Sequence, residues 1–298
     1  MNLVTALFTP LLHLLVVLAS ASSIMASSPA SPWADTPLSL IHTPQLASGK
    51  TDIFTTGATH MCLLHNAIFR GYNSIALQAA HVDDGQDKAD FIGYCLTWFK
   101  LVKSHHDDEE DNLFPKIQAL LKDDTVWEET HKEHASFLDG LTEFHDYLAS
   151  LVSPLDFDGA VLLEIMASFE KPFANHFRNE ITTIAALADH PNAPRADTPE
   201  EAEAAAMFKA WGKATVSKAG MLDAVPFFLL NHDRSSGFED GRWSAWPPMP
   251  APIRWGLVNL AGAWNSGWWQ FASCDSAGQP QTLYALRPGV GKETKQEL

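Results

Sequence analysis

The chain has 298 residues, a formal net charge of −16 at pH 7 and three cysteines. This length suits one large domain, or a domain with an extension. The negative charge counts against nucleic acid as a partner, because phosphate recognition needs clustered Lys and Arg. Cys62, Cys95 and Cys274 are widely spaced and odd in number, so they form neither a disulfide framework nor a CxxC site, and we expect buried free thiols.

An apolar leader occupies residues 1–26, and the first basic residue of the chain is Lys50. A signal peptide would explain the leader and would place the protein in the secretory pathway or outside the cell. The alternative is a disordered leader on a cytoplasmic protein, which the lack of a basic n-region favours. A membrane-spanning helix fits less well, because Pro10 and His13 interrupt the apolar run. Residues 27–52, rich in Ser, Pro and Ala, predict a linker.

The next part of the chain, residues 53–190, predicts an all-α fold, an antiparallel up-down four-helix bundle. Its first helix spans about 59–81, where apolar residues recur at spacings of three and four. His65 lies on the same face, so we expect it to point into the bundle.

The second helix has two lines of residues that could face the core. One apolar line leads to His105 and Glu109, whereas the neighbouring line leads through Lys103 to His106 and Glu110. A lysine one turn before the ligands would have to be buried or pushed aside, which costs free energy. We therefore assign His105 and Glu109 to the interior and treat His106 and Glu110 as their neighbours.

The third helix follows a break at Pro115, where the missing N–H predicts the end of the second helix. Residues 123–125 supply cap residues for its start. His131 and His134 then fall on the apolar face, so both are expected to point inward. His145 lies on the same line but about three turns further on, too far to join one cluster.

The fourth helix is expected over about 158–188. His176 and Glu180 lie one turn apart on its apolar face. Pro172 removes a backbone hydrogen bond one turn before this pair, which predicts a local kink.

Residues 191–298 differ in composition and are predicted to form an extension, helical in part and irregular and rich in Trp beyond it. Thr198 begins a capping-box pattern for one more helix that ends near Gly220. The later part is too aromatic for a disordered tail, so we expect it to pack on the bundle. The polar run 231–233, Asn-His-Asp, is either a second polar site or a loop with satisfied hydrogen bonds.

The inward histidines and glutamates of the four helices indicate a metal site. Burying this many imidazoles and carboxylates without a cationic partner would cost several kcal/mol for each ionised group. Two metal ions would meet this demand, with Glu109 and Glu180 able to bridge them. Imidazole and carboxylate ligands without thiolate suit non-haem iron, which we favour over manganese and zinc.

The combined pattern resembles the hemerythrin or HHE cation-binding domain family. The resemblance rests on His65, on His105-x-x-x-Glu109 followed by Leu113-Phe114-Pro115, on Glu133-His134, and on His176-x-x-x-Glu180. Two longer stretches, 65–75 and 176–181, are similar to the fungal hemerythrin-like branch, in which a segment like 226–233 also tends to follow the bundle. The match is strong over about 58–188 and weaker to about 286.

The resemblance implies an antiparallel four-helix bundle that holds an oxo- or hydroxo-bridged di-iron centre. Carried over by position, Glu109 and Glu180 would bridge, and the terminal ligands would be His65, His105, His134 and His176. His131 is a further candidate ligand, although it lies three residues from His134 where animal oxygen carriers have a spacing of four. Glu180 also follows His176 by four residues instead of five. Both departures weaken a role in reversible oxygen carriage.

The expected function is therefore non-haem di-iron binding of O₂, NO or peroxide, for storage, sensing or detoxification. A di-iron oxidase or peroxidase-type enzyme is the alternative, and an iron-storage protein is a third. Whether the protein is an enzyme stays open from the sequence.

Overall fold

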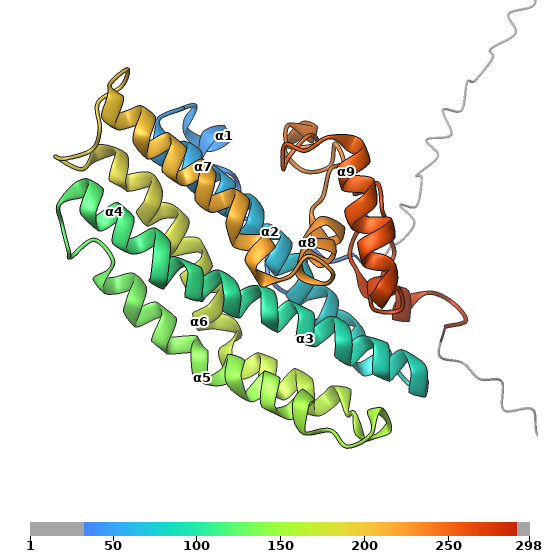
Figure 1. The fold of residues 1–298 in the computed structure, drawn as a ribbon. Helices are drawn as coiled ribbons and strands as arrows, with labels where there is room; N and C mark the ends of the chain where they lie inside the picture. The colour runs from blue at the N-terminus through green and yellow to red at the C-terminus, as the bar shows by residue number, and fades with distance from the viewer. Residues whose placement is uncertain (1–32, 291–298) are drawn as a thin grey trace, which may run out of the picture. The chain divides into compact units, whose positions relative to one another are not determined.

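The computed structural model describes residues 33–290, and within that range there are helices and no strands. Four long helices form an antiparallel bundle (Figure 1): α2 (Ile53–Gln78), α3 (Gly85–Asp108), α5 (Glu128–Ser150) and α6 (Gly159–Ala186). Aspartates cap three of them: Asp52, Asp84 and Asp158 each accept a hydrogen bond from a backbone N–H in the first turn. The all-α bundle expected from the sequence is confirmed.

The second rod of the bundle is longer than the sequence predicted. After α3 the chain makes a π-helical turn, η2 (Glu109–Leu113), and continues into α4 (Phe114–Leu121). The helix therefore does not end at Pro115, and that prediction is wrong. Pro115 lies in the first turn of α4, where a missing N–H costs least, and the wider π turn precedes it. Helix α6 likewise runs through Pro172 as one helix.

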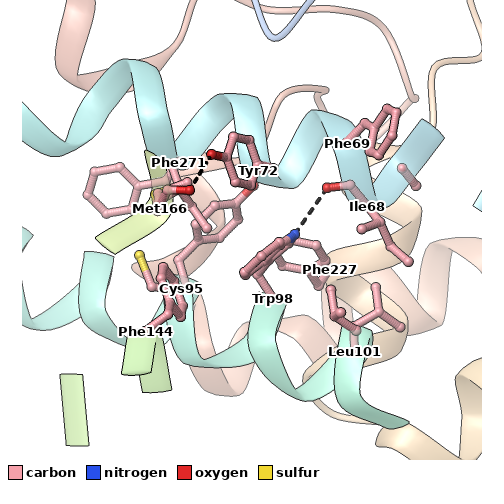
Figure 2. Close-up of a cluster of buried hydrophobic side chains, with 14 of the residues drawn as sticks. Ile68, Phe69, Tyr72, Cys95, Trp98, Leu101, Phe144, Met166, Phe227 and Phe271 are labelled. Atoms are coloured by element: carbon pink, nitrogen blue, oxygen red, sulfur yellow. Dashed lines mark hydrogen bonds between the residues drawn. The ribbon is translucent and has the colours of Figure 1, made fainter. Parts of the chain in front are cut away.

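Large aromatic side chains fill much of the bundle core. Trp98 is fully buried, and its indole Nε1 donates a hydrogen bond to the Ile68 carbonyl at 3.0 Å (Figure 2). The Tyr72 hydroxyl donates to the Met166 carbonyl at 3.1 Å. Both polar ends are thereby satisfied, so these rings can be buried without an unpaired donor.

The extension covers the bundle along α2 and α3 (Figure 1). Helix α7 (Pro199–Ala219) lies against both, and α8 (Ala224–Asn231) is buried against α2, α3 and α7. Helix α9 (Ala251–Gly256) follows, and the remaining helical elements are short: η1 (Ala79–His81), η3 (Pro154–Asp156), η4 (Leu187–Asp189), η5 (Glu239–Gly241), η6 (Leu257–Ala261), η7 (Gly262–Asn265), η8 (Trp268–Phe271) and η9 (Tyr284–Leu286).

The predicted leader, residues 1–26, lies outside the described residues. The described part of the predicted linker is held against α2 by two asparagines. The side-chain oxygen of Asn73 accepts from the Leu38 N–H, and that of Asn66 accepts from the Ile41 N–H, each at 2.8 Å. The short helix α1 (Pro44–Ser48) follows. Among the described helices, none combines the length and apolarity needed to span a membrane.

Candidate metal centre

Six of the predicted ligands meet in the interior of the bundle. Helix α2 supplies one, the α3–η2 rod two, α5 one and α6 two: His65, His105, Glu109, His134, His176 and Glu180. None of them is more than 3% exposed. Each lies on the core-facing line of its helix, and the bundle brings those lines to one depth.

One half of the cluster pairs His65 with His105. Their Nε2 atoms are 3.0 Å apart. His105 Nε2 is 3.0 Å from Glu109 Oε1, and His65 Nε2 is 3.3 Å from Glu180 Oε2. These four residues can each offer one donor atom within 4.8 Å of the others, so together they could hold one cation.

The other half pairs His134 with His176, whose Nε2 atoms are 3.1 Å apart. His134 Nε2 is 3.9 Å from Glu109 Oε2, and His176 Nε2 is 3.9 Å from Glu180 Oε2. Each carboxylate therefore faces one histidine of each pair. This is the arrangement expected of two carboxylates shared by two cations.

The outer nitrogens of His65 and His134 are held by the chain itself, whereas that of His176 is buried near a carboxylate without a hydrogen bond. His65 Nδ1 donates to the Phe177 carbonyl at 2.9 Å, which leaves Nε2 as a lone-pair donor facing the cluster. His134 Nδ1 lies 2.5 Å from Glu110 Oε1 and His176 Nδ1 lies 3.5 Å from Glu133 Oε2. Such outer contacts fix the orientation of metal-binding imidazoles and raise their basicity.

The buried carboxylates of the cluster would be stabilised by added positive charge. Burial raises the pKa of Glu109 and of Glu180 well above their usual range, and it lowers the pKa of His105 to about 4. Glu109 Oε1 and both Glu180 carboxylate oxygens are buried without a hydrogen-bond donor. Unpaired acceptors of this kind are costly in a dry interior, and divalent cations would satisfy them together with the four neutral imidazoles. The residues present therefore fit a two-metal centre.

His131 lies outside this cluster, and the expectation that it points inward is wrong. Its side chain is 45% exposed, and Nδ1 lies 3.0 Å from Glu110 Oε1. A spacing of three residues leaves it about 60° from the direction of His134 on the helix, enough to move it to the surface of α5. Lys103 is also at the surface, where it pairs with Asp107.

The sequence analysis missed the outer partners Glu110 and Glu133. Glu110 follows Glu109 directly, at the start of the π turn, and Glu133 precedes His134. Glu133 Oε1 also accepts from Asn179 Nδ2 at 2.6 Å, which ties α5 to α6 beside the centre. Acidic residues adjacent to predicted ligands were the available signal.

The fold and the site together define a metal-binding helical bundle. Residues 56–188 match the family described as Hemerythrin HHE cation binding domain. The chain is also 30% identical over 228 residues, 76% of this chain and 81% of the other, to the "Dimeric xanthone biosynthesis cluster protein R11" of Cryptosporiopsis sp. (strain 8999). No solved structure gives a significant match. The chain belongs to the hemerythrin HHE cation-binding family.

Proposed function

We propose that the protein binds two non-haem iron ions and, through them, O₂, NO or peroxide. The observation that carries this proposal is the placement of Glu109 and Glu180 between two pairs of histidines. Nitrogen and carboxylate donors without thiolate suit iron in this setting. Bound iron would supply the redox chemistry, and the chain supplies the donors and their orientation.

Small ligands suit the centre because aromatic rings enclose it. Phe177 packs on His65 with ring centroids 4.4 Å apart, Phe137 on His176 at 5.2 Å, and Phe114 stacks on His134 at 5.9 Å. A diatomic molecule or peroxide needs little room, whereas a bulky substrate would have to displace these rings. Exclusion of water also strengthens the interaction between the donors and a cation.

The direct test is metal content and ligand spectra. The purified wild-type chain is expected to hold about two iron atoms, with near-ultraviolet charge-transfer absorption, and the reduced protein should change its spectrum with O₂, NO or peroxide. Glu109→Gln should lose at least one iron, since it removes a donor charge from both histidine pairs. Asp111→Asn, an exposed neighbour in the same turn, is the matched control and should keep both. Background iron in the wild type would refute the proposal.

An enzymatic role is the second candidate, and the name of the similar Cryptosporiopsis protein favours it. That protein is named for a biosynthesis cluster, which points to a chemical step instead of ligand storage. The enzyme would use the same six residues. Catalytic turnover of peroxide by the iron-loaded chain, lost in Glu109→Gln and kept in Asp111→Asn, would support this candidate, whereas stoichiometric binding without turnover would favour the first.

A further inference from the structure

The extension contains a pocket of about 300 Å³ that belongs to no part of the metal centre. It lies among three segments, with Arg234 on one, residues 245–259 on the second and residues 276–277 on the third. The second segment includes α9. The pocket therefore combines parts of the chain that come together only in the folded extension.

Arg254 is one of the residues that line this pocket, and its guanidinium group is largely unpaired. The residue is 7% exposed. Its Nη2 donates to the Leu229 carbonyl at 3.0 Å, but Nε and Nη1 are buried without any hydrogen-bond partner. Buried guanidinium N–H groups are normally paired, so their orphan state indicates a missing acceptor.

A second guanidinium adds to the positive charge. Arg234 lines the same pocket and donates only to backbone carbonyls, those of Ser244 and Ala277. Within residues 33–290, neither Arg234 nor Arg254 has a carboxylate at ion-pair distance. Burial, and next the charge of Arg234, lower the pKa of Arg254 to about 10, so Arg254 stays charged at neutral pH. Two unpaired cations side by side in a chain of charge −16 favour an anionic ligand.

Two tryptophans supply the apolar part of the pocket. Trp246 is held in place by Phe228 and by His232, with ring centroids 5.6 Å and 5.0 Å away. Burial lowers the pKa of His232 to about 3, so this ring adds no charge behind Trp246 at neutral pH. Trp255 also lines the pocket and is 58% exposed, which leaves its ring available to a ligand.

We infer that this pocket binds an aromatic carboxylate, with its carboxylate on Arg254 and Arg234 and its ring against Trp246 and Trp255. The guanidinium groups select a planar oxyanion, and the indole rings select a flat apolar body. An inorganic anion would satisfy the arginines but would leave the indole rings without a partner. A neutral aromatic molecule would leave the guanidinium groups unpaired.

The test is calorimetric titration of the full chain with three probes: benzoate, benzamide and inorganic phosphate. Benzoate is expected to bind about tenfold more tightly than its neutral isostere benzamide, and more tightly than phosphate. Equal affinity for benzamide and benzoate, or tighter binding of phosphate, would overturn the inference. The titration is repeated after chelator dialysis, because carboxylates also bind metal ions. Benzoate binding that disappears with the metal would likewise overturn it.

Variants assign the binding to the pocket. Arg254→Gln should weaken benzoate binding about tenfold or more, and the half-buried Arg234→Gln, which is safer for folding, should weaken it several-fold. Arg242→Gln changes an exposed arginine that lies between Arg234 and the 245–259 segment and does not line the pocket, and it should bind as the wild type does. Unchanged affinity in Arg234→Gln, with folding verified by circular dichroism, would contradict the assignment.

Discussion

At the scale of single residues, the centre depends on which of two adjacent side chains faces the core. His105 and Glu109 are buried, while the side chains of His106 and Glu110 remain 13% and 29% exposed. The charge on Lys103 decides between the two lines, because it needs the surface that the outer line provides. The sequence left the 231–233 run as either a second polar site or a loop, and the structure places Asn231 at the end of α8. Asn231 Oδ1 accepts from Tyr94 and from the Ser273 N–H and its Nδ2 donates to the Phe227 carbonyl, whereas His232 Nδ1 is buried without a partner.

His232 should make stability depend on pH. Its folded pKa of about 3 lies below the unfolded value of 6.5, so between these pH values the unfolded chain binds more protons and stability falls as pH falls. From pH 7 to pH 5 this contribution amounts to about 2 kcal/mol. In urea denaturation, the free energy of unfolding of His232→Gln should fall less from pH 7 to pH 5 than that of the wild type, by about this amount. His145→Gln removes a histidine outside the core and should lose as much as the wild type. Equal losses in the wild type and His232→Gln would contradict the prediction.

At the scale of elements, the π turn lets the continuous helix α3–η2–α4 present ligands at the centre and also bury its last two turns. The α3 segment places His105 at the centre, and the extra residue in η2 rotates α4 so that Phe114 and Leu121 are buried. Phe114 stacks on Trp127 with ring centroids 4.2 Å apart. π-helical turns inside α-helices often occur at functional sites, and this one begins at a predicted bridging ligand.

Deleting Asn112 tests the role of the π turn. The deletion should restore α-helical spacing and rotate α4 by about 100°, which turns Phe114 away from Trp127. Lost burial of α4 should lower the free energy of unfolding by about 3–5 kcal/mol, measured by chemical denaturation. Asn112→Ala keeps the chain length and is the control, expected to cost far less. A deletion variant as stable as this control would show that the π turn does not set the position of α4.

At the scale of the whole described molecule, the extension and the bundle share one core. The large core cluster includes α8 residues such as Phe227 beside Trp98 of α3. Gly71 lets these two rings approach, since an added Cβ would come within 2.7 Å of both. Gly93 likewise lets Trp268 of η8 approach α3, since an added Cβ would lie only 2.2 Å from the indole Cε2. The extension therefore packs on the helices that carry His65 and His105.

Gly93→Ala should disturb this packing. The new methyl group would collide with the Trp268 indole, and overpacking of this kind costs about 1–3 kcal/mol, measured as the change in unfolding free energy. Trp268→Ala should cost less in the Gly93→Ala background than in the wild type, because in that background it also removes the indole ring that clashes with the new methyl group. Gly212→Ala in α7, where a Cβ meets nothing within 4 Å, should be neutral or slightly stabilising. Additive effects of the Gly93 and Trp268 changes would refute the contact.

The sequence by itself determined the bundle and the faces of its helices, because burial follows a local period of 3.6 residues that can be read from neighbours along the chain. It also proposed the six residues that meet in the centre. Only the tertiary structure decided the exposed position of His131, the continuation of the helix through Pro115 and the outer partners Glu110 and Glu133. It alone assembled the pocket around Arg254. The outer partners and the pocket depend on contacts between segments distant in sequence, which no local period encodes, and the π turn changes the helical register just before Pro115.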